Sequence, residues 1–382
     1  MFEITNTESQ EAIIKVIGVG GCGGNAVDHM IRNETKGVEF ICLNTDAQAL
    51  KGNQAPTLLQ LGANVTRGLG AGANPEVGKE AALEDRDRIA EMIQGADMLF
   101  ITAGMGGGTG TGAAPIVAQI AKDMGILTVA VVSKPFSFEG KRLKAAQLGM
   151  EALAQYVDSL IVIPNDKLMN VLGNDISMLD AFRAANDVLY GAVAGIAEVI
   201  NCPGHVNVDF ADVKTVMSEM GMAMMGSAVS SGVDRARMAA EQAVASPLLE
   251  DIALTGARGV LVNITASSTM KMREVQEVMD TIKKLTAEDA TVIVGTVIDE
   301  DMGESLRVTL VATGLGSVSQ QAQRPLKVIN ARTGTDDRDM SHNIDEPAVM
   351  RTGRRGNAVV AAMQQSGMDP MDIPAFLRRQ AD

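Results

Sequence analysis

The sequence predicts an α/β protein: an N-terminal parallel-sheet domain, a long central helix, a C-terminal α/β domain, then a flexible linker and a short recognition tail. Near-continuous apolar segments alternate with segments of helical spacing up to residue 176. This alternation is typical of strands buried on both faces of a parallel sheet. A helical apolar stripe follows, and polar sequence without periodicity begins after residue 316. The 382 residues suffice for roughly two to three domains.

The first domain is expected over residues 12–176, after a polar, acidic extension at 1–11 that lacks the features of a signal peptide. Apolar runs bounded by glycine or polar residues predict its strands. These strands are residues 12–20, 38–44, 97–104, 126–133 and 159–164. Helical spacing lies between them, for example at 75–93 and 109–123.

The central helix is expected over residues 177–201, where Ser177 supplies a cap and Asp180 favours the positive helix end. Its apolar stripe comprises Leu179, Phe182, Leu189, Val193, Ile196 and Ile200. Its length is enough to bridge two domains.

The second domain is expected over residues 223–316, after a loop and helix at 202–222. Its predicted strands are 259–267, 290–299 and 306–314, and its predicted helices are 234–245 and 271–286. The last two strands lack a helix-sized connection, so we expect them to be antiparallel neighbours.

The C-terminal part of the sequence divides into a linker and a tail. Residues 317–368 are rich in Gln, Arg, Asp, Ser and Gly, which predicts a flexible linker. In the tail, 369–382, Asp372 is a candidate helix cap with Pro374 near the first position. The composition fits a frayed end as well as a recognition peptide that folds on a partner, because a helix this short is unstable alone.

Composition excludes several classes of function. The net charge of −14 and the absence of Trp argue against nucleic-acid binding. Cys22, Cys42 and Cys202 form no C-x-x-C pair, and the three histidines lie far apart in the sequence, so we expect no metal site built by protein side chains. No apolar run approaches the roughly 18 residues that span a bilayer. We therefore expect a soluble cytoplasmic protein without direct membrane insertion.

Residues 18–25, GVGGCGGN, follow a predicted strand and open a predicted helix. Gly18, Gly20 and Gly23 spell G-x-G-x-x-G, and Asp46 lies at the end of the next strand. This context is that of a Rossmann-like dinucleotide site, which makes a dehydrogenase one candidate. A tight strand–helix turn without a ligand is the other interpretation of this loop.

Two further glycine-rich loops favour a nucleoside triphosphate over a dinucleotide as the ligand. Residues 104–115, GMGGGTGTGAAP, also connect a strand to a helix, and Thr109 and Thr111 add hydroxyl donors. Residues 67–75, RGLGAGANP, precede another helix. The three loops should meet at the carboxyl edge of the sheet. No Walker motif is present and no lysine lies within the loops, so backbone dipoles and Mg²⁺ would balance the phosphate charge.

At this point the sequence resembles the FtsZ branch of the tubulin family. GGGTGTG at 106–112 is the tubulin-family signature. The other motifs that carry the resemblance are NTDAQAL (44–50), GLGAGANPEVG (68–78), NVDFADV (207–213), PLLEDIALTGARGVLVNIT (247–265) and DIPAFLRRQ (372–380). They agree in order over roughly residues 12–316 plus the tail.

The resemblance implies GTP and GDP as ligands, with Mg²⁺ and K⁺ as accompanying cations. Glu139 and Arg142 would contact the ribose, Phe182 would stack on guanine, and Asn25 and Asn186 would read its edge. The nucleotide-binding residues it implies are Gly20, Gly21, Cys22, Gly23, Gly24, Asn25, Asn44, Asp46, Gly70, Ala71, Gly72, Gly104, Gly106, Gly107, Gly108, Thr109, Gly110, Pro135, Glu139, Arg142, Phe182, Asn186 and Asp187.

The resemblance further implies a catalytic centre shared between two subunits of a head-to-tail polymer. Asp209 and Asp212 would enter the neighbour's site and polarise the attacking water, with Asn207 hydrogen-bonding nearby. From the residues alone, Asp209 reads as a helix cap and Asp212 as a charge that complements the helix dipole; both roles are compatible. The product would be a filament of the bacterial division ring, assembled at midcell beneath the inner membrane.

The resemblance assigns the tail to membrane-anchoring and regulatory division proteins. The contact residues would be Asp372, Ile373, Pro374, Phe376, Leu377, Arg378 and Arg379.

The sequence departs from the family pattern at three points. Cys22 stands where glycine is usual, and it would cost about 1 kcal/mol if that position required positive φ. The order Asn186–Asp187 reverses a common Asp–Asn pair, and FEGKRLKAA (138–146) is one residue shorter than in many relatives, which weakens the assignment of Arg142. A scaffold that binds GTP and hydrolyses it poorly is therefore a third candidate, beside the polymerising GTPase and the dehydrogenase.

Overall fold

The computed structural model describes residues 12–173, 176–201, 208–219, 221–246, 248–249, 256–284, 286–287 and 290–315. The expected N-terminal extension, linker and tail lie outside the described residues, as do Asn207 and Cys202. All described residues belong to one compact unit of the chain.

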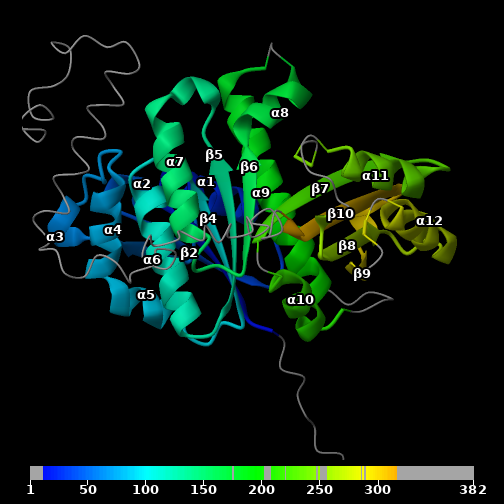
Figure 1. Ribbon diagram of the computed structural model, residues 1–382, viewed down its shortest axis with the longest axis horizontal. Coiled ribbons are helices and arrows are strands. Elements are labelled where there is room, and N and C mark those ends of the chain that lie inside the picture. The colour runs from blue at the N-terminus through cyan, green and yellow to red at the C-terminus, as the bar shows by residue number, and fades with distance from the viewer. Residues whose placement is uncertain are drawn as a thin grey trace, which may run out of the picture. The chain divides into compact units, whose positions relative to one another are not determined.

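The first half of the chain alternates strands and helices as predicted (Figure 1). Its strands are β1 (Ile14–Val19), β2 (Val38–Asn44), β3 (Thr57–Gln60), β4 (Met98–Gly104), β5 (Leu127–Lys134) and β6 (Ser159–Pro164). Its helices are α1 (Gly20–Arg32), α2 (Ala47–Lys51), α3 (Ala63–Thr66), α4 (Pro75–Glu84), α5 (Arg86–Ile93), α6 (Thr109–Asp123), the short η1 (Ser137–Glu139), α7 (Lys141–Leu153) and α8 (Asn165–Leu172).

The second half begins with the long α9 (Met178–Asn201) and α10 (Phe210–Met217). The remaining elements are β7 (Gly221–Ser231), α11 (Arg235–Val244), β8 (Gly259–Ala266), α12 (Met272–Lys283), β9 (Thr291–Ile298), η3 (Glu300–Met302) and β10 (Ser305–Leu315). The cap predicted for α9 is present, because the Asp180 amide donates to Ser177 Oγ at 3.1 Å.

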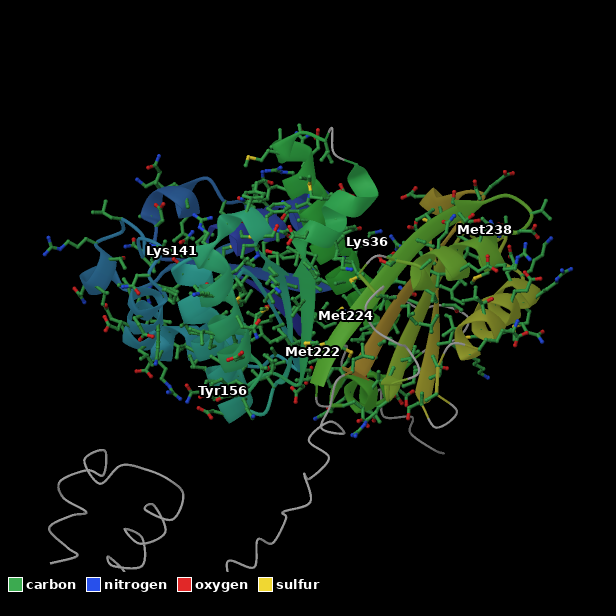
Figure 2. All side chains as sticks on the ribbon, turned by 45° about the horizontal axis from the view of Figure 1, so that its top comes forward. Lys36, Lys141, Tyr156, Met222, Met224 and Met238 are labelled. Atoms are coloured by element: carbon green, nitrogen blue, oxygen red, sulfur yellow. The ribbon has the colours of Figure 1, made fainter. Side chains whose placement is uncertain are left out.

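The described strands form one ten-stranded sheet in the order β3-β2-β1-β4-β5-β6-β7-β10-β8-β9. The six strands of the first half are parallel to one another, and β7 continues that direction beside β6. Met222 and Met224 mark the start of β7 at the junction between the two halves (Figure 2). The sheet is therefore continuous from the first domain into the second.

The prediction that 290–299 and 306–314 are antiparallel neighbours is wrong. β10 lies between β7 and β8 and is antiparallel to both, and β9 pairs with the far side of β8 in parallel. The short connection after β9 therefore crosses one strand, while α12 supplies the helical crossover that a parallel β8–β9 pair requires.

Three apolar clusters show how the helices cover this sheet. On one face of the first half, α1 and α9 pack through Met30, Leu189 and Val193. On the opposite face, α5, α6 and α7 pack through Ile89, Val117 and Leu153. A third cluster joins α11 and α12 to β8 and β10. The central parallel strands are covered on both faces, as their apolar sequences predict.

Candidate functional site

Three glycine-rich loops meet at the carboxyl edge of the parallel sheet. The Thr45 and Thr109 hydroxyls share a hydrogen bond of 2.6 Å, which joins the end of β2 to the start of α6. The Gly70 amide donates to the Thr45 carbonyl at 3.2 Å, so the loop at 67–75 is tied to the same point. These contacts confirm the predicted convergence for the loops at 104–115 and 67–75.

The loop after β1 needs glycine at two positions for different reasons. Gly20 has φ of +75°, and a Cβ there would lie 3.0 Å from the Gly110 nitrogen of the loop after β4. At Gly23 a Cβ would lie 2.4 Å from the Thr102 carbonyl oxygen, so this glycine lets α1 pack directly on β4. The loop residues are thus selected by close approach of backbones.

Two helices begin at this edge with their N-termini side by side. α1 begins at Gly20 and α6 at Thr109. Helix N-termini expose amide hydrogens and carry a partial positive charge, so together they form a site for anionic groups. The first turns of both helices contain no acidic side chain, which leaves that positive potential available to a ligand.

Two cavities adjoin at these loops and share Gly20 and Gly21. The larger, of about 540 Å³, is lined by further predicted residues: Gly24, Asn25, Asn44 and Asp46. The smaller, of about 260 Å³, is lined by predicted residues Cys22, Gly104, Gly107, Gly108, Thr109, Gly110, Pro135, Glu139, Arg142 and Phe182. Most of the predicted nucleotide-binding residues therefore gather in one place.

Glu139, Arg142 and Phe182 form one wall of the smaller cavity. Arg142 Nη1 donates to Glu139 Oε2 at 2.8 Å, and the other oxygen of that carboxylate accepts from the Phe136 amide at 3.0 Å. The Phe182 ring meets Phe136 edge to face, with centroids 5.9 Å apart, and stays half-exposed. A polar pair beside an accessible aromatic face suits a sugar attached to a planar base.

Asn165 is a site residue that the sequence analysis missed. It lines the smaller cavity with only 5% of its surface exposed, and its Oδ1 has no hydrogen-bond partner among the described residues. A buried, unpaired amide oxygen indicates a missing donor. The available signal was its position, because Asn165 directly follows β6 at the same sheet edge as the glycine loops.

The backbone strain considered for Cys22 does not occur. Cys22 lies within α1 and is absent from the described residues with positive φ, whereas Gly20 takes that conformation. Its Sγ lies 3.5 Å from Ser133 Oγ. Burial raises the pKa of the Cys22 thiol, against a smaller opposing effect of the Ser133 hydrogen bond. The side chain therefore stays an uncharged thiol beside the anion site.

Several predicted residues line neither cavity. Their role in the loops is visible for Ala71, since a Cβ on Gly108 would lie 2.8 Å from the Ala71 Cβ. Asp187 points to His29 on α1, with Oδ1 2.7 Å from His29 Nε2. The full set outside the two cavities is Gly23, Gly70, Ala71, Gly72, Gly106, Asn186 and Asp187.

The predicted catalytic acids lie at the opposite edge of the sheet. Asp209 caps α10, with its Oδ1 accepting from the Asp212 amide at 2.8 Å, and both residues are exposed. α10 ends at Met217, whose carbonyl accepts from Ser159 Oγ, on the first residue of β6, at 2.7 Å. The C-terminal end of α10 is thus fixed at the amino end of β6, and neither Asp209 nor Asp212 lines either cavity.

The length of the central helix α9 indicates how far the acids lie from the cavities. Phe182, in the first turns of α9, lines the smaller cavity. Asn201, at the other end, donates to the Gly37 carbonyl just before β2 begins. The 24 residues of α9 correspond to about 36 Å of helix. Figure 1 shows α10 at the far end of α9 from α8. Within one subunit, α10 and the two cavities therefore lie toward opposite ends of α9.

The described residues contain no cluster of three His, Cys, Asp or Glu side chains that could hold a metal ion. Among the described helices, none is both long and apolar enough to cross a bilayer.

Two family models match the chain in order. Residues 13–173 match the Tubulin/FtsZ family, GTPase domain, and residues 221–316 match the FtsZ family, C-terminal domain. Among curated proteins, cell division protein FtsZ from Pseudomonas aeruginosa is 58% identical, with 100% of both chains covered. The FtsZ of Coxiella burnetii is also 58% identical, with 99% of both chains covered.

Solved structures give the same result. An FtsZ dimer from M. jannaschii superposes with a TM-score of 0.77 at 43% identity, covering 81% of this chain and 89% of that one. CetZ1 from Haloferax volcanii, at 21% identity, has a TM-score of 0.70 over 81% of this chain and 96% of its own, and shares the fold.

Proposed function

Because the chain belongs to the Tubulin/FtsZ family and carries both the GTPase domain and the FtsZ C-terminal domain, we propose that it is a cell-division GTPase that polymerises head to tail. GTP bound in the cavities of one subunit is hydrolysed with acids of the next. The observation that carries this proposal is the placement of the cavities and the Asp209–Asp212 pair at opposite ends of α9. The dehydrogenase alternative leaves the second and third glycine loops unexplained.

Three groups of residues contact three parts of the nucleotide: the phosphates, the ribose and the guanine base. The N-termini of α1 and α6, with Gly107 to Gly110 between them, receive the phosphates through backbone amides. The Glu139–Arg142 pair, 2.8 Å apart, faces the ribose. Phe182 stacks on guanine, and Asn25 and Asn186 read its edge. Asn165 joins this group, because its unpaired Oδ1 accepts a hydrogen bond from the ligand.

We propose that Asp209 and Asp212 combine both of their predicted roles, of which the structure shows the capping role of Asp209. The Asp209 carboxylate caps α10 and so orients the helix, while the exposed Asp212 carboxylate is free to face a neighbouring subunit. A carboxylate positioned beside the terminal phosphate orients water and accepts its proton. Hydrolysis then depends on contact, because neither subunit alone holds the phosphates and the acids together.

The rim of the cavities supports a docking role for this edge. Leu69, in the third glycine loop, is 86% exposed, and Phe138, next to Glu139, is 73% exposed. Apolar side chains so exposed around a ligand site mark an interaction surface. The opposite edge carries the acids, so the two contact surfaces differ. Such a heterologous contact builds an open filament.

Mg²⁺ fits this site as a companion of the phosphates. Asn44 and Asp46 place two oxygen-bearing side chains on the larger cavity. With no cluster of three acidic ligands among the described residues, the ion would take its remaining oxygens from phosphate and water. When bound, it neutralises phosphate charge; K⁺ is the monovalent cation we propose to accompany it.

A mixing experiment tests the shared site. Asp212→Ala keeps the cavities and loses the acid. Gly107→Asp keeps the acid and puts a like charge in the phosphate site, at a position where a Cβ meets nothing within 4 Å. Each variant alone should release no phosphate above background. At equal amounts, roughly a quarter of head-to-tail contacts pair an intact cavity with an intact acid, so phosphate release should return.

The outcome separates the three candidates. A silent mixture, with Asp212→Ala still binding GTP and sedimenting with Gly107→Asp, would contradict the shared site. Wild-type protein that sediments with GTP without releasing phosphate would support the poorly hydrolysing scaffold. Protection of the wild type from unfolding by NAD, with no protection by GTP, would support the dehydrogenase alternative.

We also propose that the tail at 369–382 recruits membrane-anchoring and regulatory division proteins, so that the cytoplasmic filament assembles at midcell beneath the inner membrane. Its support is the capped amphipathic pattern of Asp372, Pro374 and Phe376 in the sequence. Deleting 369–382 should abolish pull-down of such partners and leave GTP turnover within about twofold of wild type, since the shared site lies elsewhere. Loss of turnover on deletion would contradict this modular role.

A further inference from the structure

Two helices border the place that the proposed function gives to guanine. Asn25 lies on α1 and lines the larger cavity. Phe182 lies on α9 and lines the smaller one, with Asn186 one turn further along the helix. Recognition of the base edge therefore depends on the distance between α1 and α9. The inference that follows rests on the proposed function, because it requires a base between these helices.

One contact ties α1 to α9 directly beside these residues. His29 lies four residues after Asn25, on the same side of α1. Its Nε2 is 2.7 Å from Asp187 Oδ1, and Asp187 is the neighbour of Asn186. The His29 ring also meets Tyr190 edge to face, with centroids 6.1 Å apart at 83°. The imidazole on α1 thus contacts a carboxylate and an aromatic ring that both belong to α9.

The His29 and Asp187 side chains differ in their exposure to solvent. The His29 side chain is 23% exposed and that of Asp187 is 63% exposed. His29 Nε2 is buried and has no hydrogen bond of regular geometry among the described residues, which leaves the Asp187 carboxylate as its polar partner. Asp187→Ala would remove the only polar contact recorded for this nitrogen among the described residues, the 2.7 Å approach of Asp187 Oδ1.

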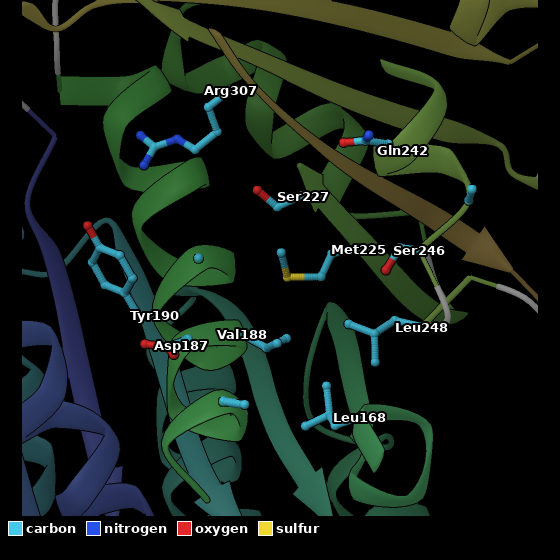
Figure 3. A pocket seen from close by; sticks show the side chains of 13 residues that line it. Leu168, Asp187, Val188, Tyr190, Met225, Ser227, Gln242, Ser246, Leu248 and Arg307 are labelled. Atoms are coloured by element: carbon cyan, nitrogen blue, oxygen red, sulfur yellow. The ribbon is translucent and has the colours of Figure 1, made fainter. Parts of the chain in front are cut away.

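Asp187 itself does not reach the nucleotide cavities. It lines a different cavity of about 570 Å³, together with Ala184, Val188 and residues of the C-terminal domain. In Figure 3, Asp187 and Tyr190 project from one side of α9 and Val188 from the other. The recorded surroundings of the Asp187 side chain are therefore His29 and this separate cavity.

We propose that Asp187 is a positioning residue for guanine recognition, acting through His29. Its carboxylate holds the imidazole against α9 and so fixes the spacing of α1 and α9. That spacing lets Asn25 and Asn186 face the same base edge. The role differs from direct recognition, in which the carboxylate would touch the ligand.

A double-mutant cycle on nucleotide binding tests the proposal. The dissociation constants of GDP and IDP, which lacks the 2-amino group, are measured on full-length protein diluted below the concentration of assembly. The variants are Asp187→Ala, His29→Phe, which keeps a ring against Tyr190, and the two combined. Asp123→Asn is the control, because this carboxylate is 56% exposed and pairs with Arg86 at 2.8 Å on a different helix.

Each single variant should weaken GDP binding about tenfold, and IDP binding by less, so that the preference for GDP shrinks. The double variant should lose no more than either single variant, because both remove the same contact. Asp123→Asn should leave both dissociation constants unchanged.

Three results would overturn the positioning role. Additive losses in the double variant would mean that Asp187 touches the ligand independently of His29. Equal losses for GDP and IDP would mean a general loss of structure, and unchanged affinities would mean that the contact is irrelevant. Failure of the wild type to bind GDP would instead contradict the proposed function, independently of the role of Asp187.

Discussion

Cys22 lies within α1, in the glycine-rich loop after β1, and its surroundings determine the reactivity of its thiol. Its thiol has a raised pKa, mainly from burial, so little thiolate is present at neutral pH. We predict that iodoacetamide labels Cys22 in the folded protein at pH 7 at least about tenfold more slowly than in urea-unfolded protein. GDP should slow the labelling further, because Cys22 lines the smaller cavity. Mass spectrometry of the Cys22 peptide measures both rates.

Fast labelling that GDP does not change would show that Cys22 is ionised and outside the nucleotide site. Reaction of the folded protein should rise with pH beyond the range in which an ordinary cysteine levels off, since the thiolate forms later when the pKa is raised.

The residues of the site differ in how well they could be predicted from the sequence. The glycines and Phe182 were predictable because motif spacing and family resemblance agreed on them. Asn165 was not, because one amide after an apolar strand carries no spacing signal of its own. The strain considered for Cys22 was wrong since motif position does not reveal which residue of the turn takes positive φ; here it is Gly20.

At the scale of elements, α4 and α6 are packed so closely that only glycine fits between them. A Cβ at Gly112 would lie 1.9 Å from the Pro75 carbonyl oxygen. Gly112→Ala should therefore lower the free energy of unfolding by about 3 kcal/mol and weaken GDP binding, because Asn74 and Pro75 adjoin the glycine loops. Urea unfolding and GDP titration measure the two effects.

Gly191→Ala is the matched control within a helix. Its nearest neighbour to an added Cβ would be Met225 Cε at 3.9 Å, which is ordinary contact. This change should raise the free energy of unfolding by about 0.5 kcal/mol, as alanine favours helix. If both variants were equally destabilised, close packing at Gly112 would not be the cause.

In the C-terminal domain, the buried Arg235 on α11 and the partly buried Glu274 on α12 form an ion pair of 2.7 Å. The hydrogen bond from Arg235 is the main cause that lowers the pKa of Glu274 below its ordinary value of 4.5. Glu274→Gln should lower the free energy of unfolding by about 3 kcal/mol at pH 7. The exposed pair Arg273–Glu277, at 2.8 Å, is the control, and Glu277→Gln should change stability by less than about 0.5 kcal/mol.

The pH dependence of this pair has a definite sign. A lowered pKa means that the folded state favours the carboxylate, so the stabilisation is present above pH 4.5 and is lost as pH falls through the lowered pKa. The difference between wild type and Glu274→Gln should therefore shrink on acidification in urea-unfolding series. A difference that stays constant down to low pH would contradict the ion pair as its source.

The elements themselves were predictable where sequence periodicity was strong. The buried parallel strands and α6 lie where their apolar patterns placed them. β7 was missed because GMAMMGSAVSS has few β-branched residues, and β3 because it has only four residues. The pairing of β10 with β7 and β8 was beyond local sequence, since a short connection favours neighbours and here it crosses a strand.

At the scale of the whole molecule, α9, whose 24 residues correspond to about 36 Å of helix, lies between the two cavities and the Asp209–Asp212 pair. We predict that phosphate release per subunit rises steeply with protein concentration and reaches a plateau only when most subunits are in contact. A phosphate assay across a dilution series, paired with sedimentation, measures this. Asp212→Ala should stay near background at every concentration. Undiminished turnover by wild-type protein at high dilution would contradict the shared site.

In the proposed head-to-tail filament, the two different edges of the subunit would make the two ends chemically unequal. At one end the last cavity has no neighbour above it and faces water. If hydrolysis needs the acids of the next subunit, as proposed, GTP in that cavity would meet no carboxylate from another copy and would persist while GTP deeper in the filament is consumed. The proposed shared site therefore predicts a triphosphate cap at one end of the filament without any capping factor.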